Sequence, residues 1–208
     1  MSSVFGERIK VSIFGQSHSK SIGVTIDGLP AGERIDFEEL QTFLERRAPG
    51  RDRYSTPRRE ADKPVFLSGF VDDVLCGAPV TAVIENGNTR SQDYDKLRDV
   101  PRPGHADYTA WVKYGAAHDI AGGGHFSGRL TAPLCIAGGM CKQLLRKKGI
   151  RINAHIYGIG GIHDTPYAYS CDDETAYHDK CDAMTGFPVL DAAAGEKMCE
   201  LIESVRLQ

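Results

Sequence analysis

The sequence lacks several features that mark membrane, secreted and multidomain proteins. It contains no run of about 18 apolar residues, and its first ten residues, MSSVFGERIK, include no apolar segment of a secretion signal. No internal repeat, low-complexity segment or clean linker divides the 208 residues. We therefore expect a soluble, cytoplasmic protein with no membrane partner, folded as a single domain over residues 1–208.

An excess of positive charge is also absent from the chain as a whole. The 25 Lys and Arg are outnumbered by 28 Asp and Glu, which gives a formal net charge of −3. General nucleic-acid binders are normally basic. This balance predicts no nucleic-acid partner, although positive charge is concentrated locally.

The six cysteines include no CxxC pair. Such scattered cysteines are typical of reduced, mostly buried thiols in a cytosolic protein. A zinc site formed by Cys171, His178 and Cys181 is the alternative, but their spacing matches no standard ligand set. We expect no metal site.

Apolar periodicity predicts both strands and helices. Strands are expected over residues 8–14, 22–26, 63–70, 79–85 and 150–157, which are rich in Val and Ile. One helix is expected to begin after Asp36, whose spacing to Glu39 resembles a capping box, and others over 131–148 and 190–207. The pair Gly138-Gly139 predicts close packing of the second helix against another backbone. Residues 163–182 are polar, and we expect a loop there.

An irregular segment, residues 101–129, concentrates chemically active side chains. It shows no clear helical or strand period, and long irregular segments in compact chains are usually functional or disordered. Four aromatic residues, which disordered segments generally lack, provide apolar anchors. We interpret the segment as the lining of a site for an anionic substrate or cofactor. It contains His105, His118, His125, the run Gly122-Gly123-Gly124 and the aromatics Tyr108, Trp111, Tyr114 and Phe126.

Six arginines lie between Arg46 and Arg59, in a loop interrupted by Pro49, Gly50 and Pro57. One interpretation is a solvated loop whose arginines pair with neighbouring acidic residues, each exposed pair contributing about 0–1 kcal/mol. The other is a clamp for phosphate and carboxylate groups, which guanidinium groups bind through two parallel hydrogen bonds. We favour the clamp.

Taken in order, these segments resemble the chorismate synthase family. The polar connection Gly15-Gln16-Ser17-His18 is similar to the family's FGESHG motif, and a lone loop histidine gains weight only from such a context. Further motifs follow in family order over residues 8–165. They are RRAPG at 46–50, RREAD at 58–62, SQDY at 91–94, RPGHAD at 102–107, KYG at 113–115, GGG at 122–124 and SGRLT at 127–131.

The resemblance implies an α+β fold, a β-α-β sandwich that assembles as a homotetramer when full length. It implies a carbon–oxygen lyase of the shikimate pathway, which leads to the aromatic amino acids. That enzyme converts 5-enolpyruvylshikimate-3-phosphate to chorismate by 1,4-anti elimination of phosphate. It requires reduced FMN without net redox change, and NADPH is a candidate reductant of the flavin.

Motif position also implies roles for individual residues. His105 would protonate or hydrogen-bond the reduced flavin, His18 would assist the leaving phosphate, and Ser17 would belong to a proton relay. The implied substrate- or NADP-binding residues are Arg47, Arg53, Arg102 and Arg129, and the implied FMN-lining residues are His125, Phe126 and Ser127. Four histidines match no family motif and are expected to be structural or solvated: His118, His155, His163 and His178.

The chain departs from the family pattern in two ways. Gln16 and Ser19 replace a usual glutamate and glycine, and His125-Phe126 replaces a usual Arg-Ser pair beside the flavin. Family members are also considerably longer, so we expect a domain incomplete at its C-terminus, lacking a catalytic aspartate and exposing apolar surface. Two alternatives to an active enzyme follow. One is a flavin- or anion-binding fragment without catalysis, and the other is an RNA-binding protein that uses the arginine loop with Tyr54, without RNP-like or KH signatures.

Overall fold

The computed structural model describes residues 3–48, 62–87, 100–167 and 174–207. They fall into two compact units, one formed by the described residues up to Leu144 and the other by those from Leu145 onward. Compact units need not fold alone, so a single domain over residues 1–208 stays a prediction. Among the described residues, no helix is both long and apolar enough to cross a membrane.

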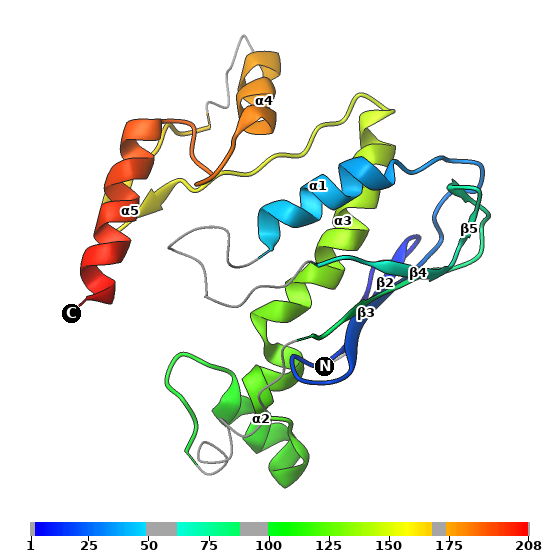
Figure 1. Ribbon diagram of the computed structural model, residues 1–208, viewed down its shortest axis with the longest axis horizontal. Coiled ribbons are helices and arrows are strands. Elements are labelled where there is room, and N and C mark those ends of the chain that lie inside the picture. Colours follow the sequence, from blue (N-terminus) through cyan, green and yellow to red (C-terminus); the bar gives the residue numbers. More distant parts are fainter. Residues whose placement is uncertain (1–2, 49–61, 88–99, 168–173, 208) are drawn as a thin grey trace. The chain divides into compact units, whose positions relative to one another are not determined.

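The first unit is built on a five-stranded antiparallel sheet with the strand order β1-β2-β3-β7-β4 (Figure 1). The strands predicted over 8–14, 22–26, 63–70 and 79–85 all lie in it, so these four predictions are confirmed. A two-stranded ribbon, β5 (Phe70–Val71) with β6 (Val74–Leu75), lies outside the sheet order. The sheet strands are β1 (Val4–Phe5), β2 (Lys10–Gly15), β3 (Ser21–Asp27), β4 (Val65–Ser68) and β7 (Val80–Glu85).

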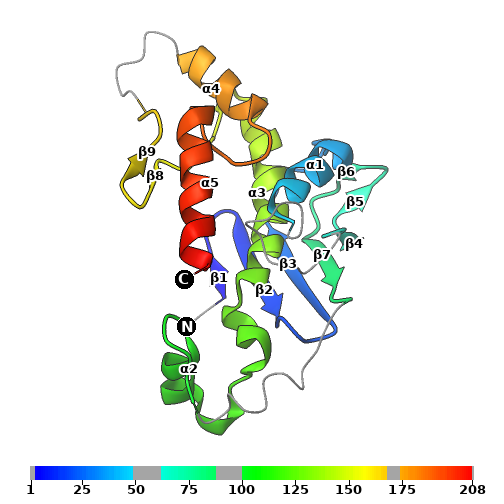
Figure 2. The same cartoon turned by 60° about the vertical axis from the view of Figure 1, so that its left-hand side comes forward.

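One face of this sheet forms the core with helices α1 (Phe37–Arg47) and α3 (Thr131–Arg146), as Figure 2 shows. Strands β3 and β7 alternate as their sequences predict, with large aliphatic side chains on the helix-facing side. Burying a side chain of this size stabilises the fold by about 1.5–3 kcal/mol. The aliphatic residues of these strands that are fully or almost fully buried are Ile22, Val24, Ile26, Val80 and Ile84.

Helix α1 begins where the capping pattern predicts. The Asp36 side chain accepts hydrogen bonds from the backbone N–H groups of Glu38 and Glu39, both at 2.9 Å. The backbone of Asp36 is also held by α3, because it donates to Gln143 Oε1 and accepts from Gln143 Nε2, each at 2.8 Å. This joint fixes the start of α1 against α3.

The paired glycines of α3 differ in their surroundings. A Cβ added to Gly139 would lie 2.5 Å from Leu40 Cδ1 and 3.0 Å from Phe43 Cδ1, whereas one added to Gly138 would meet nothing within 4 Å. Close packing therefore occurs at Gly139 and not at Gly138. The predicted backbone partner was wrong, because the neighbours of Gly139 are side chains of α1.

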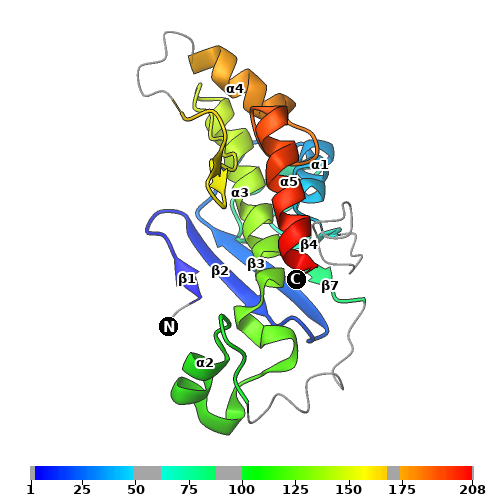
Figure 3. The same ribbon diagram turned by 90° about the vertical axis from the view of Figure 1, so that its left-hand side faces the viewer.

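The irregular segment contains more helix than its sequence indicated. Helix α2 (Asp107–Tyr114) lies beyond the N-terminal end of α3 (Figure 3), and the 3-10 turns η2 (Gly115–Ala117), η3 (Ala121–Phe126) and η4 (Gly128–Leu130) follow it. The prediction of no helix was thus wrong for residues 107–114. Because α2 buries little besides Asp107 and Ala110, it has no apolar stripe of the usual width. The expected aromatic anchors are exposed: Tyr108, Trp111, Tyr114 and Phe126.

The second unit contains α4 (Glu174–Ala183), α5 (Ala192–Arg206) and a short hairpin of β8 (Gly158–Ile159) with β9 (Ile162–His163). Helix α5 confirms the prediction over 190–207. The prediction of a loop over residues 163–182 was wrong from residue 174 onward, where α4 forms. The low apolar content of α4, which buries Cys181 alone, explains why periodicity missed it.

The strand predicted over residues 150–157 is also wrong, because these residues belong to no strand among those described. The alternation is present but inverted. Arg151 and Asn153 turn toward α4, where both bond to Asp182, while Ile152 is exposed. His155 bonds to the buried Asp164 at 2.8 Å. The polar residues, rather than the aliphatic ones, hold this segment in place.

The described cysteines are all free thiols. Cys181 and Cys199 are buried, Cys135 and Cys141 are half-buried, and Cys76 is exposed. Burial raises the pKa of the Cys135 and Cys141 thiols, which keeps them protonated and weakly reactive near neutral pH. Cys171 lies outside the described residues.

Candidate active site

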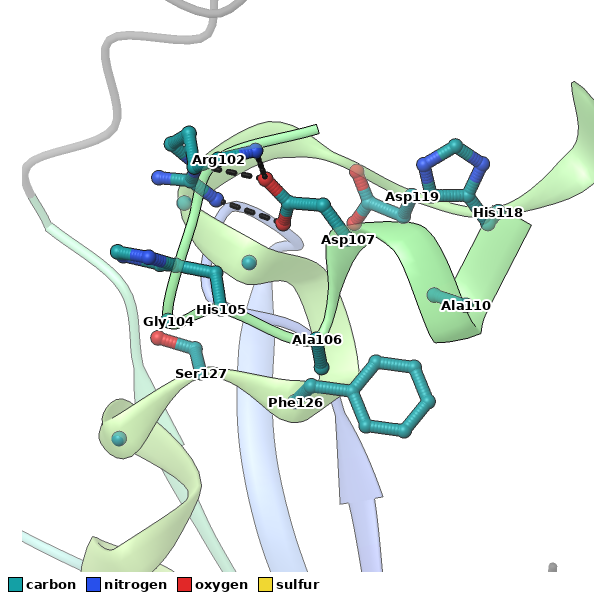
Figure 4. A pocket seen from close by; sticks show the side chains of 13 residues that line it. Arg102, Gly104, His105, Ala106, Asp107, Ala110, His118, Asp119, Phe126 and Ser127 are labelled. Carbon is teal, nitrogen blue, oxygen red and sulfur yellow. Dashed lines mark hydrogen bonds and ion pairs between the residues drawn. The ribbon is translucent and has the colours of Figure 1, made fainter. Parts of the chain in front are cut away.

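A cavity of about 280 Å3 opens in the first unit, where the irregular segment folds back on itself. Its walls come from the loop 102–107, the start of α2, the glycines 122–123 and residues 126–128. Figure 4 shows that Arg102 and Asp107 point toward one another, whereas Phe126 and Ser127 project in different directions. The sequence-predicted residues that line the cavity are Arg102, His105, Phe126 and Ser127.

The loop that carries His105 is closed by its own ends. Arg102 donates from Nε to Asp107 Oδ2 at 2.7 Å and from Nη2 to Asp107 Oδ1 at 3.0 Å, and its backbone N–H also donates to Oδ2 at 3.0 Å. The hydrogen bonds from Arg102 hold the pKa of the Asp107 carboxyl below its ordinary value, against the opposing effect of burial. Much of the Arg102 fork is therefore used inside the protein.

His105 itself is exposed, and its ring is held through one nitrogen. Its Nδ1 lies 3.1 Å from the carbonyl oxygen of Pro103. A carbonyl oxygen can only accept, so Nδ1 carries a hydrogen and Nε2 is left with a lone pair in the neutral ring. The imidazole can thus accept a proton at Nε2, or donate one from it after protonation.

The glycines 122–124 lie beside the turn that carries Ser17 and His18 (residues 15–19, the His18 turn), at the wall of the same cavity. Their φ values are 60°, 84° and 55°, in the left-handed region where glycine is favoured. A Cβ on Gly122 would lie 2.3 Å from His18 Cε1 and 2.7 Å from Ser17 Oγ. The backbone N–H of Ser17 donates to the carbonyl oxygen of Gly124 at 3.0 Å, and the Ser17 side chain is buried. The structure therefore places His18 and Ser17 against Gly122, which also lines the cavity with His105.

His125 fastens this arrangement from another direction. Its Nδ1 lies 2.9 Å from the carbonyl oxygen of Gly15, and its Nε2 lies 2.8 Å from Ser3 Oγ. Both ring nitrogens are therefore engaged within the protein, and the side chain does not line the cavity. His125 joins the glycine segment to the first residue of the His18 turn.

Two of the predicted anion-binding arginines share one buried carboxylate. Arg47 donates to Asp62 Oδ2 from Nε at 2.9 Å and from Nη2 at 2.8 Å, while Arg129 Nη1 pairs with Asp62 Oδ1. The Asp62 side chain is fully buried, and those of Arg47 and Arg129 are 19% and 5% exposed. The pairing expected of a solvated loop does occur at Arg47, but it is buried. Arg53 lies outside the described residues, as do Arg51, Arg58, Arg59 and the SQDY motif.

Four further residues of this region were not singled out as site residues from the sequence. His118 lines the cavity, and its Nδ1 lies 2.9 Å from the Gly115 carbonyl oxygen, while its buried Nε2 has no hydrogen-bond partner among the described residues. Asp107 and Asp62 hold arginines, and Asn86 bonds to Arg129. Motif spacing indicated Asp107 and Asp62, which end RPGHAD and RREAD. No local pattern marks Asn86, whereas His118 lies in the segment 101–129 that we interpreted as site lining.

Comparisons with known proteins agree with the resemblance. A family model described as chorismate synthase matches residues 9–208. The chorismate synthase of Lancefieldella parvula is 47% identical over 217 residues, covering 99% of this chain and 56% of the relative. The chorismate synthase of Thermococcus kodakarensis is 39% identical, covering 96% of this chain and 57% of the relative. The chain thus spans about half the length of the curated relatives it matches.

A solved structure described as a crystal structure of chorismate synthase aligns with a TM-score of 0.69 at 22% identity, covering 96% of this chain and 53% of that one. Similarity at this identity shows the fold alone. The expected α+β class is confirmed. The described residues supply one five-stranded sheet of that fold with helices on one face.

Proposed function

The chain belongs to the chorismate synthase family, and we propose that its described residues form part of a site that eliminates phosphate from 5-enolpyruvylshikimate-3-phosphate to give chorismate. One observation carries the proposal. Gly122 contacts His18 and also lines the cavity that contains His105, although the two histidine motifs are far apart in the sequence. A carbon–oxygen lyase that acts on a phosphorylated substrate needs acid–base groups converging in this way.

Binding of the substrate would depend on fixed positive charge. The substrate carries a phosphate and two carboxylates, and charge-assisted hydrogen bonds contribute about 1.5–3 kcal/mol each. Arg47 and Arg129 together with Asp62 leave one net positive charge in a largely buried cluster. Arg102 lines the cavity beside His105. We propose that these arginines, with Arg53, attract and orient the substrate anions.

His18 would act at the phosphate end of the elimination, whereas His105 would protonate or hydrogen-bond the reduced flavin. As the carbon–oxygen bond breaks, the phosphate leaves with the electron pair, and a proton transferred from His18 would lower its negative charge. A ring proton leaves on the opposite face to a proton acceptor of the relay. Its C–H electron pair forms one new double bond, while the double bond already in the ring shifts to the carbon that loses phosphate. Ser17 would join the relay that carries protons away from the site.

The lining of the cavity supports the binding of a flat ring system with a polar edge. Gly122, Gly123 and Gly128 present backbone without side chains, and Phe126 and Ser127 add an aromatic ring and a hydroxyl group. We propose that these residues would hold reduced FMN, with His105 Nε2 facing it. His125 has both ring nitrogens engaged, so its contribution would come from its backbone or from holding the segment. When bound, reduced FMN supplies electron density as phosphate leaves and recovers it when the ring proton is lost.

Three further properties are proposed on family membership alone. They are assembly as a homotetramer, reduction of the flavin by NADPH, and location in the cytoplasm. Analytical ultracentrifugation and NADPH oxidation in the presence of FMN test the first two directly.

Turnover tests the proposed function. The purified chain is mixed anaerobically with chemically reduced FMN and 5-enolpyruvylshikimate-3-phosphate, and chorismate is followed by absorbance. We expect the wild-type chain to form chorismate. In His105→Ala the rate of chorismate formation should fall by about 10²–10⁴-fold, the usual contribution of a general acid–base group. His163→Ala is the control, because His163 lies in the second unit, on β9.

Other outcomes would separate the alternatives. FMN binding without turnover would indicate a flavin- and anion-binding protein without catalysis. A folded protein that neither binds FMN nor forms chorismate would contradict the proposed function.

A further inference from the structure

We propose that Asn86 and Asp62 are positioning residues of this site, which together fix Arg129 and tie it to the turn that carries His18. The inference depends on the proposed function for its effect on turnover, but the positioning itself can be measured without any ligand.

Asn86 joins two parts of the site through one side chain. It follows strand β7, and its Oδ1 accepts a hydrogen bond from Arg129 Nε at 3.3 Å. On its other side, Nδ2 donates to the carbonyl oxygens of Gln16 at 3.1 Å and Ser19 at 2.8 Å. These carbonyls flank Ser17 and His18. Asn86 therefore links the Arg129 guanidinium to the His18 turn on both sides of Ser17 and His18.

The chemistry of this link requires an amide. Arg129 can only donate, so the atom facing it must be an acceptor, and the two carbonyl oxygens can only accept, so the atom facing them must be a donor. An aspartate would suit Arg129 but would place a carboxylate oxygen against two carbonyl oxygens. An apolar side chain of similar size would remove the hydrogen bonds to Arg129 Nε and to the two carbonyl oxygens.

Asp62 performs the matching task on the other side of Arg129. It lies between Arg129 and Arg47, and Arg47 Nη1 donates in turn to Thr131 Oγ1 at 3.2 Å. Two guanidinium groups this close would repel each other without an intervening carboxylate. Asp62 also has a φ of 44°, a left-handed conformation that Asp and Asn tolerate better than most residues. Its replacement by asparagine therefore changes the charge without adding backbone strain.

The result is a continuous polar chain from α1 to the His18 turn. It runs from Arg47 through Asp62, Arg129 and Asn86 to the carbonyls of Gln16 and Ser19. The glycine segment meets the same turn from a different side, through the Ser17–Gly124 hydrogen bond and the contact of Gly122 with His18. The backbone of the His18 turn, which Gln16 and Ser19 also close locally, is therefore tied to residues distant in sequence.

The first test uses Asn86→Asp and follows the histidine Cε1–H resonances of the ligand-free protein by NMR. We expect the His18 resonance to move or broaden, while those of His105 and of His155 in the second unit stay in place. Asn86→Ala, which removes the amide without adding a charge, is expected to give the same pattern. An unchanged His18 resonance in both variants, with native melting behaviour, would overturn the proposal.

The second test uses Asp62→Asn and inorganic phosphate as the probe, with Asp27→Asn as the matched control. Both substitutions remove one negative charge, but Asp27 is exposed at the end of β3. If Asp62 merely neutralised the arginines, its loss would tighten phosphate binding. Because we assign it a positioning role, we expect binding to weaken by about tenfold or more relative to Asp27→Asn. Tighter binding would overturn this half of the proposal.

Kinetics then distinguish the two residues. Asn86→Asp is expected to lower kcat with little change in KM, because it displaces His18, whereas Asp62→Asn is expected to raise KM. A wild-type chain that forms no chorismate, combined with the expected His18 shift in Asn86→Asp, would contradict the proposed function and support the positioning role.

Discussion

The His18 turn and the His105 loop differ in how far their supporting contacts reach. The His105 loop is closed locally, by the Arg102–Asp107 pair and by the Pro103 carbonyl. The His18 turn is also closed locally, by hydrogen bonds between Gln16 and Ser19. Distant segments contact it as well, through Asn86, the glycines 122–124 and His125. The position of His18 therefore depends on the end of β7 and on the glycine segment, whereas the contacts that hold the His105 loop come from its own residues.

The largest effect should come from breaking the contact between Gly122 and His18. In Gly122→Ala, the new Cβ would lie 2.3 Å from His18 Cε1, so the ring must move. Gly123→Ala is the matched control, because its φ of 84° is similarly left-handed but its nearest neighbour would be Ser127 Cβ at 3.7 Å. Both should lose about 1–2 kcal/mol of stability through backbone strain.

We expect Gly122→Ala to reduce turnover by about 100-fold more than Gly123→Ala, in line with the usual cost of misplacing a reacting group. It should also shift the His18 resonance, whereas Gly123→Ala should not. Equal losses in the two variants would show that strain, rather than the position of His18, matters at this segment.

The next largest effect should come from breaking the Arg102–Asp107 pair, which closes the His105 loop. Asp107→Asn removes the charge that holds both Nε and Nη2 of Arg102. We expect the free energy of unfolding to fall by about 1–3 kcal/mol, because a hydrogen bond to a charged group is lost. The His105 resonance should shift while that of His18 stays in place, the reverse of Asn86→Asp. Denaturant unfolding and the NMR spectrum measure the two effects, and a His18 shift would contradict the division into a local and a distant mode of support.

The pH dependence of stability should reveal the same local pair. The pKa of Asp107 is lower in the folded protein than its ordinary value of about 3.9, chiefly because of the hydrogen bonds from Arg102. The contribution of Asp107 to the free energy of unfolding is therefore complete above its ordinary pKa, and it is lost as the pH falls through the folded-state pKa. Urea unfolding between pH 7 and pH 3 should show a steeper loss of stability in the wild type than in Asp107→Asn. Parallel curves would contradict the prediction.

The smallest effects concern helix α3, which begins two residues after Arg129. Gly138→Ala should stabilise the protein by up to about 1 kcal/mol, because the site is open and alanine favours helix. Gly139→Ala should destabilise it, since the new Cβ would lie 2.5 Å from the buried Leu40 Cδ1. Neither should move the His105 resonance. Thermal melts of the two variants provide the comparison, and a stabilising Gly139→Ala would show that α1 can shift away from α3.

The contrast between the two histidines also explains what the sequence could predict. The hairpin strands β2 and β3 and the cap at Asp36 depend on nearby residues, and they were predicted. The contact of Gly139 with Leu40 and Phe43 joins residues distant in sequence, and its partners were not predicted. Helices α2 and α4 bury little apolar surface, so periodicity could not reveal them. Residues 150–157 alternate with their polar side turned inward, where Asp182 and Asp164 bind them. That preference depends on a helix about 25 residues further along.

The site shows the same limit. The motifs predicted His18 and His105 as site residues, but not that Asn86 bonds to both the His18 turn and Arg129. Asparagine after a strand is equally common in ordinary turns. Pairings between residues tens of positions apart arise from the fold, and a single sequence contains no local signal for them.

The most direct test of the account is a titration of the ligand-free chain with 5-enolpyruvylshikimate-3-phosphate, followed through the histidine Cε1–H resonances. We predict that His18 and His105 shift together with one dissociation constant, while His155 and His163 of the second unit do not move. Shifts at only one of the two site histidines, or with two different constants, would contradict a single shared site.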